Sequence, residues 1–303
     1  MTSNHTASFN LDHIIKPDQI RNTELQDGNR ISYKQSWHVL KQIEKQVFGD
    51  ETESFKRIPF FLKNLSQVDP QAYWWLETQN SQFFWLFITS GPTQEAFYWC
   101  RSFIALDGTF WKTHWNLTLL IAATIDGDNQ ILPLAWGFMP TESTDNWSFF
   151  LSHFRHMFPS LRDQELKFTL INDRSKGLAP ALIVEFLNAL HAYYCYHLDE
   201  NFMQFHPGEE VRNLFWKTVR APSKIQFQEY LEVIRKLHKI TAEYLDQIPS
   251  QHWAKYAIPD PRYNHLTSNI AESVNSSWLN IRNLPILTAL ESIWNSMMEK
   301  FYI

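Results

Sequence analysis

The chain has 303 residues, of which 44% are hydrophobic and 16% aromatic, and its formal net charge is −5. This composition supports a sizeable packed core and excludes an intrinsically disordered chain, while 8 glycines are too few for a glycine-rich repeat protein. No segment reaches ~18 consecutive apolar residues, so a membrane span is not expected, and the only two cysteines, Cys100 and Cys195, exclude a disulfide framework and paired CxxC zinc modules.

The first hundred residues predict a small α/β layer that precedes the main domain. Residues 1–30 are polar and are expected to be loosely ordered. A helix is predicted over 31–48, where apolar residues recur at helical spacing, and a second over 53–68, interrupted at Pro59. Residues 31–100 would then form one N-terminal unit with three short strands, at 72–76, 83–88 and 95–98.

Three strands are predicted next, and they should form the centre of a sheet. The first, 103–106, is an apolar run that ends on Asp107. The other two, 119–125 and 131–138, are joined by Asp126-Gly-Asp-Asn129, and Asp-Gly between apolar runs indicates a hairpin. A carboxylate at the end of a buried strand is poorly placed for the core and well placed to hold a metal ion.

Helix and strand then alternate. The helix predicted over 145–158 carries a buried stripe of Trp147, Phe150, Leu151, Phe154 and Phe158. A fourth strand, 166–171, leads to Asp173, as the first strand leads to Asp107. A helix over 179–190 and a fifth strand over 191–197 follow. Each Asp alone is more simply a turn or cap residue, but sites in α/β sheets form at strand ends, so the two together are a candidate site.

The last third of the chain is predicted to be helical. Residues 198–264 show no periodic strand and are interpreted as a helical insertion. Residues 268–281 predict a helix whose apolar stripe lies beside Glu272. A final helix is expected from about Pro285, so that residues 265–303 would complete the core that begins with 101–197.

Several short motifs, taken in order, resemble the Mutator-like element (MULE) transposase domain. They are Ile104-Ala-Leu-Asp-Gly-Thr-Phe110, the hairpin 119–134, Asp145-Asn-Trp147, Asn172-Asp-Arg-Ser-Lys-Gly-Leu178 and Thr267-Ser-Asn-Ile-Ala-Glu-Ser-Val-Asn275. The resemblance covers about residues 30–300. It implies a ribonuclease-H-like α/β fold, as in other DDE transposases and retroviral integrases. The expected architecture is a mixed five-stranded sheet flanked by helices, with an all-helical insertion before the last catalytic helix.

The resemblance places the family's three catalytic acids, which would also be the metal ligands, on Asp107, Asp173 and Glu272. Phosphodiester cleavage needs an activated nucleophile and a stabilised leaving oxygen, and two divalent ions ~3.5–4 Å apart supply both. Mg²⁺ prefers a few carboxylates together with water and phosphate oxygens. We therefore expect two Mg²⁺ or Mn²⁺ ions, with Asp107 as the natural bridging ligand.

The sequence departs from the family at its Cys-x-x-His pair. When the motif is aligned on His197, Tyr194 stands where the cysteine is expected, and Cys195 gives Cys-x-His instead. The plain interpretation is two partly buried residues on a strand; a metal site with His191 is the alternative, and zinc is not expected. Full-length members also carry zinc-binding DNA-recognition modules, which this chain lacks, so it resembles a catalytic core or a truncated copy.

Four further residues are candidates for DNA contact: Arg174, Lys176, Asn269 and Asn275. The two cations follow the second acid and could equally belong to a solvated turn. The two asparagines flank Glu272 and could instead orient it. Glu142 precedes the helix over 145–158 and is interpreted as a charge that complements the helix dipole.

The leading interpretation is a metal-dependent transposase that cuts element ends and joins them to target DNA. The resemblance implies DNA as the partner, a homo-oligomer on DNA and a nuclear location. The alternative is a catalytically silent, domesticated transposase that acts as a nuclear transcriptional regulator or interaction module; the three acids favour the enzyme. A related nuclease stays open because a fold does not fix its substrate, and the slightly acidic balance counts against a dedicated DNA-binding module.

Overall fold

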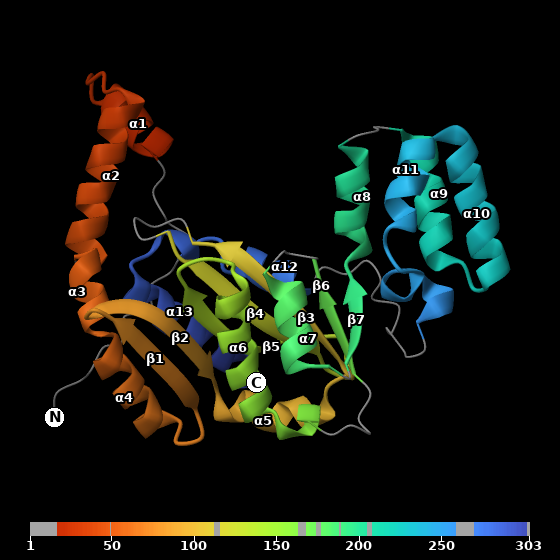
Figure 1. The fold of residues 1–303 in the computed structure, drawn as a ribbon. Coiled ribbons are helices and arrows are strands. Elements are labelled where there is room, and N and C mark those ends of the chain that lie inside the picture. Colours follow the sequence, from red (N-terminus) through yellow and green to blue (C-terminus); the bar gives the residue numbers. More distant parts are fainter. Residues whose placement is uncertain are drawn as a thin grey trace. The chain divides into compact units, whose positions relative to one another are not determined.

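The computed structural model describes residues 17–48, 50–111, 116–162, 168–173, 177–187, 189–204, 208–258 and 270–301. The chain forms two compact units (Figure 1). The smaller comprises residues 1–68, 111–116 and 276–303, and the larger comprises residues 69–110 and 117–275. Within the described ranges, every helix is too short or too polar to cross a membrane.

The smaller unit is built from helices. They are α1 (Pro17–Gln26), α2 (Tyr33–Phe48), α3 (Glu51–Lys56), α4 (Ile58–Val68) and α13 (Ile286–Met298). The expected helix over 53–68 is divided at Arg57, two residues before the predicted break. Pro59 lies in the first turn of α4, where its missing N–H is not needed. The backbone N–H of Leu287 donates to Ser54 Oγ at 2.8 Å and so ties α13 to α3.

The larger unit contains one mixed sheet of seven strands in the order β1-β2-β5-β4-β3-β6-β7. Their bounds are β1 (Tyr73–Gln79), β2 (Gln82–Thr89), β3 (Phe103–Phe110), β4 (Thr118–Ile125), β5 (Ile131–Met139), β6 (Thr169–Asn172) and β7 (Leu190–Tyr193). The predicted hairpin joins β4 to β5, and Asp126 Oδ1 accepts from the N–H groups of Asp128 and Gln130 at 2.9 and 2.8 Å. All eight residues of β4 are buried, so this strand lies at the centre of the core.

The expectation of five strands was wrong, because the hairpin β1–β2 joins the same sheet. Strand β2 pairs with β5 through Phe87 and Gly137, and an added Cβ at Gly137 would collide with the carbonyl oxygen of Leu86. Glycine therefore permits the close approach of the two strands. The strand expected at 95–98 was also wrong: this segment holds the end of α5 (Gly91–Ala96) and a 3₁₀ turn.

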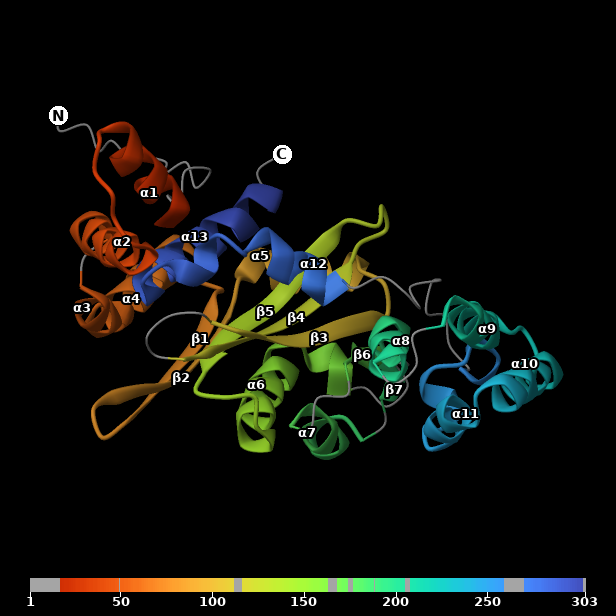
Figure 2. The same cartoon turned by 90° about the horizontal axis from the view of Figure 1, so that it is seen from above.

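Helices cover both faces of this sheet (Figure 2). On one face lie α6 (Thr144–Met157) and α7 (Leu178–Glu185), while α12 (Ile270–Ser277) lies over the other face, with its residues up to Asn275 belonging to the larger unit. The buried stripe predicted for α6 is confirmed, since each of its five aromatic or aliphatic side chains is at most 2% exposed. The mixed α/β class expected from the sequence is therefore correct.

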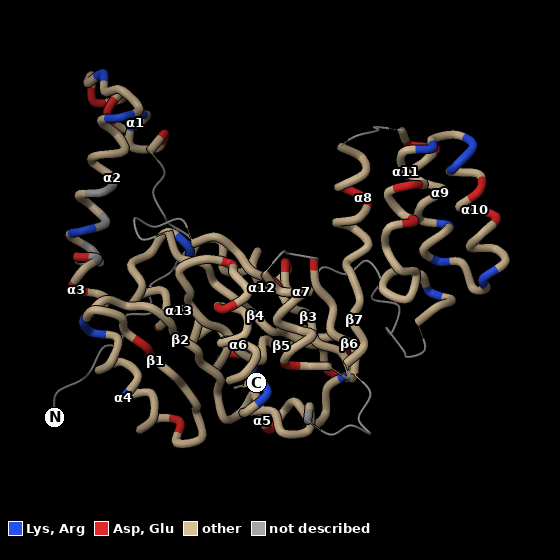
Figure 3. The backbone as a smooth tube through the Cα atoms, in the orientation of Figure 1, with Lys and Arg blue, Asp and Glu red and all other residues tan. Residues whose placement is uncertain are grey.

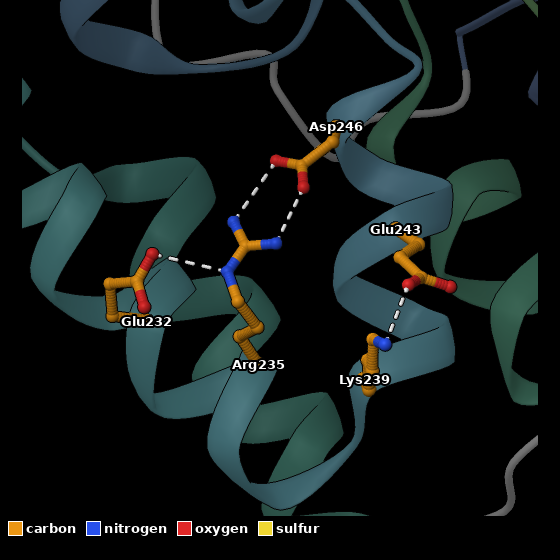
Figure 4. Close-up of polar contacts among 5 residues, drawn as sticks. All are labelled: Glu232, Arg235, Lys239, Glu243 and Asp246. Atoms are coloured by element: carbon orange, nitrogen blue, oxygen red, sulfur yellow. Dashed lines mark hydrogen bonds and ion pairs between the residues drawn. The ribbon is translucent and has the colours of Figure 1, made fainter.

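Four helices beyond β7 have a core of their own. They are α8 (Cys195–Met203), α9 (Glu209–Arg220), α10 (Lys224–Leu237) and α11 (Lys239–Asp246), and the residues buried between them include Phe202, Phe215 and Trp253. Acidic and basic positions alternate along α9, α10 and α11 (Figure 3). Arg235 bridges Glu232 and Asp246 at 3.1 and 2.7 Å, which links α10 to α11 (Figure 4).

Candidate active site

The register of the sheet brings Asp107 and Asp173 to neighbouring positions. Asp107 lies inside β3, opposite Ile121 of β4, and not after the end of the strand as the sequence suggested. On its other side β3 runs parallel to β6, where Ala105 is paired with Ile171. Two residues further along, Asp107 is still within β3 and Asp173 directly follows β6, and the charge of Asp173 raises the pKa of Asp107. The parallel pairing of β3 and β6 therefore explains how two acids distant in sequence approach each other.

Glu272 joins these two acids from α12. The first turn of α12 contains Glu272, and its buried residues Ile270, Ala271, Val274 and Asn275 hold the helix in place. The negative charge of Glu272 acts on Asp107, and that of Asp173 acts on both. The three acids predicted from the sequence thus converge on one region of the larger unit.

The pKa of Asp107 is strongly raised within this cluster. The side chain is buried, and burial raises the pKa of its carboxyl to about 8, with further increases from the charges of Asp173, Glu272 and Glu142. A hydrogen bond from Asn275 opposes this rise. A carboxyl with such a pKa, surrounded by like charges, is the kind of group that a divalent cation would convert to its ionised form.

Two side chains hold the acids by direct contacts. Asn275 Nδ2 donates to Asp107 Oδ2 at 2.5 Å, and Asn275 is only 3% exposed. The structure thus places Asn275, a candidate for DNA contact, inside the acid cluster. His197 Nε2 lies 2.8 Å from Glu272 Oε1, and its Nδ1 lies 3.4 Å from Glu200 Oε2. Burial raises the pKa of Glu272, whereas His197 lowers it.

The structure separates Cys195 from His197. The fifth strand expected over 191–197 ends at Tyr193, and both residues lie on α8. Cys195 is fully buried in the core of the four helices, where its Sγ donates to the carbonyl oxygen of Trp253 at 3.5 Å. His197 instead faces Glu272. The two side chains therefore take part in different local structures.

Tyr194 also lies near the acids, a role that sequence reasoning did not assign to it. Its backbone N–H donates to the carbonyl oxygen of Asn172 at 2.9 Å, so it follows β7 at the level where Asp173 follows β6. Its pKa is raised well above 10 by burial and by the charge of Asp107. The parallel order β3-β6-β7 was the missing signal, because it places Asp173 after β6 and Tyr194 after β7 at the level of Asp107 within β3.

The described residues contain no group of three or more His, Cys, Asp or Glu side chains positioned to hold a metal ion. The acids are thus near one another, but their side chains are not arranged to hold one metal ion together. Like charges repel, and in this structure one oxygen of Asp107 and one of Glu272 contact Asn275 and His197. Of the other DNA-contact candidates, Arg174, Lys176 and Asn269 lie outside the described residues.

Part of the chain matches a known protein family. Residues 103–201 match the family model of the MULE transposase domain. The matched region extends from β3 to α8, so it includes Asp107, Asp173 and His197, while Glu272 lies beyond it. A comparison with curated proteins found no match.

Proposed function

We propose, from the premise that residues 103–201 are a MULE transposase domain, that this chain is a metal-dependent enzyme that cleaves DNA and transfers the cut strand. The observation that supports this most strongly is the convergence of Asp107 on β3, Asp173 directly after the parallel strand β6, and Glu272 on α12. We further propose that the seven-stranded sheet is an extended form of the ribonuclease-H-like sheet. DNA would be the partner, a homo-oligomer the active form and the nucleus the location.

The donor set suits Mg²⁺ or Mn²⁺. Both are hard cations that prefer carboxylate oxygens, and Asp107, Asp173 and Glu272 would hold them. The raised pKa of Asp107 fits this assignment, because a bound cation would compensate the charge that burial disfavours. When bound, two such ions would activate the attacking oxygen and stabilise the leaving oxygen of a phosphodiester.

The protein's own side chains would prepare the acids for this role. Asn275 fixes one oxygen of Asp107, and His197 fixes one oxygen of Glu272. Beside Asp107 in the sheet lies Ile121 of β4, a strand whose residues are all buried. Rigid elements position functional groups more accurately than loops do, and here a strand and a helix provide two of the three acids.

A strand-transfer assay on pre-nicked DNA tests the proposal. We expect product with Mg²⁺ or Mn²⁺ and none with EDTA. Asp107→Asn and Glu272→Gln should each lower the rate by about 100-fold or more. This exceeds the usual effect of replacing a residue that contacts a metal ligand but not the metal itself. Asp128→Asn, an exposed position in the β4–β5 turn, is the matched control and should retain activity. Equal, metal-independent results for all variants would favour a catalytically silent regulator or interaction module instead.

A further inference from the structure

Helix α10 has apolar side chains on its outer side as well as on its core side. The core side packs among the four helices through Phe227, Leu231 and Ile234. On the outer side, Ile225, Val233 and Leu237 are 70%, 42% and 48% exposed. Single exposed apolar residues are common on protein surfaces, but these three follow the spacing i, i+8 and i+12. They therefore form one line along the helix.

Two residues of opposite charge lie in the same line. Glu229 is four residues after Ile225 and four before Val233, and Lys236 is three residues after Val233. Both side chains are exposed. Seven positions of a helix span ~10.5 Å and almost two full turns, so Glu229 and Lys236 lie on one side of α10. The midpoint between them falls beside Val233.

The neighbouring charges of α10 and α11 are already paired within the chain. Figure 4 shows these pairs: Arg235 with Glu232 and Asp246, and Lys239 with Glu243. Among the residues that the structure describes, neither Glu229 nor Lys236 takes part in an ion pair. The outer side of α10 therefore offers one free carboxylate and one free ammonium group, separated by an exposed valine.

A second copy of α10 has the complementary arrangement of charges, provided that the two helices run in opposite directions. In a parallel pair equal positions would meet, and like charges that face each other disfavour association. In an antiparallel pair with a two-fold axis beside Val233, Glu229 of each copy faces Lys236 of the other. The Ile225 end of one helix then lies against the Leu237 end of its partner. Two-fold contacts of this kind are the commonest in homo-oligomers.

We propose that α10 is a homodimer contact, in which two copies of this chain pair antiparallel through Ile225, Glu229, Val233, Lys236 and Leu237. This inference rests on the proposed function only in taking the active form to be a homo-oligomer, and the acids of the candidate site have no part in it. One pair of 14-residue helices is small for a protein–protein interface, so we expect a dissociation constant in the micromolar range.

Sedimentation equilibrium of the full chain, in EDTA and without DNA, tests this pairing separately from catalysis. The unchanged protein should form dimers whose fraction rises with concentration. Glu229→Lys brings two cations together at each contact, and Lys236→Glu brings two anions together. Each variant should weaken self-association about tenfold or more, because like charges now face each other. Lys217→Glu, a charge reversal at an exposed position of α9, is the matched control and should dimerise as the unchanged protein does.

The two single variants should bind each other. In an equal mixture, positions 229 and 236 are both basic in one copy and both acidic in the other, so each contact again joins opposite charges. The mixture should regain the affinity of the unchanged protein, and so should the double variant Glu229→Lys/Lys236→Glu. Recovery in the mixture also shows that both variants fold. Val233→Asp, which places two carboxylates beside the two-fold axis, should weaken every one of these dimers.

Three results would overturn the pairing: an unchanged protein that stays monomeric at all concentrations, a dimer that neither single variant weakens, or a mixture that stays as weak as the single variants alone. Strand transfer by the unchanged protein in Mg²⁺ or Mn²⁺ would in each case leave the proposed enzyme standing. A dimer with the expected response to the variants but without strand transfer would overturn the proposed function alone.

Discussion

Asn275 and Asp107 are 168 positions apart in the sequence, yet the Asn275 amide donates to the buried Asp107 carboxyl across 2.5 Å. This bond joins α12, which carries Glu272, to β3, which carries the first acid. It is also the contact that opposes the rise in the pKa of Asp107. One amide therefore both links the two elements of the site and favours the ionised form of its most buried acid.

Replacing Asn275 with alanine should impair both stability and activity. The buried Asp107 oxygen would lose its donor, which costs about 1–3 kcal/mol, and its pKa would rise further. We expect a lower melting temperature and a rate of strand transfer reduced by about tenfold or more. Losses of this size are usual when a residue that positions a metal ligand is removed. Asn213→Ala on the exposed face of α9 is the matched control. Unchanged stability and rate for Asn275→Ala would show that the bond is unimportant.

The pKa of Asp107 predicts how metal-free stability depends on pH. Its folded-state value of about 8 lies above the ordinary 3.8, so its stabilising contribution is complete below pH 3.8 and is lost as pH rises through 8. Asp107→Asn should lack this loss and, in EDTA at pH 9, should be more stable than the unchanged protein by up to about 5 kcal/mol, with a correspondingly higher Tm.

The same comparison with Mn²⁺ provides the internal control. A cation that binds the folded state raises its stability by mass action, and the gain should be larger for the unchanged protein than for Asp107→Asn. Thermal melts across pH 4–9, with and without the metal, measure both effects. Parallel pH profiles of the two proteins in EDTA would mean that Asp107 ionises normally.

Gly108 should be intolerant of a side chain because of Glu142. Gly108→Ala would place Cβ 2.9 Å from Glu142 Cδ and 3.1 Å from Leu120 Cδ2, and overpacking of this kind costs about 1–3 kcal/mol. In a Glu142→Ala background the first of these contacts is gone, so the cost should be smaller. A double-mutant cycle of chemical unfolding measures the coupling. Strict additivity of the two substitutions would indicate that the side chains do not meet.

His197 should set the acidic limb of the pH–rate profile. Its contact with Glu272 keeps the pKa of that acid from rising further. In His197→Gln, Glu272 should therefore remain protonated to higher pH, and the acidic limb of strand transfer should shift to higher pH. His38→Gln, an exposed histidine of α2, is the control. A limb at the same pH in both variants would exclude this role for His197.

The helices α8–α11 should depend on their aromatic core more than on their surface ion pairs. Phe215 is fully buried, with its ring 4.9 Å from that of Phe202. Phe215→Ala should destabilise these helices by about 3–5 kcal/mol. Arg235→Ala removes only the exposed contacts of Arg235 with Glu232 and Asp246 (Figure 4) and should have a smaller effect that fades at high salt. Hydrogen exchange of the α9 and α10 amides measures both; a larger effect for Arg235→Ala would contradict this order.

The elements with strong local patterns were predictable from the sequence. A few neighbouring residues are enough to predict three of these features: the apolar run of β4, the Asp-Gly turn at 126–127 and the aromatic stripe of α6. The convergence of Asp107 with Asp173 was expected from strand ends, and the parallel pairing of β3 with β6 accounts for it. Local periodicity was sufficient for these elements, whereas the pairing of β3 with β6 was visible only in the structure.

Features that depend on long-range packing were not predictable. The pairing of β2 with β5 requires the close approach at Gly137, and no neighbouring residue signals it. The strand expected at 95–98 failed for a local reason instead, because Ser90 accepts from the N–H of Thr93 and starts a helix there. The orientation of Glu142, by contrast, depends on the indole of Trp147 and on the space left by Gly108.

Anomalous scattering from crystals soaked in Mn²⁺ tests the central claim most directly. The account predicts manganese peaks within about 2.0–2.5 Å of carboxylate oxygens of Asp107, with Asp173 and Glu272 completing the coordination. Crystals of Asp107→Asn should lose these peaks. A well-phased map of the unchanged protein that shows manganese elsewhere, and none at these acids, would contradict the assignment of a metal-dependent active site.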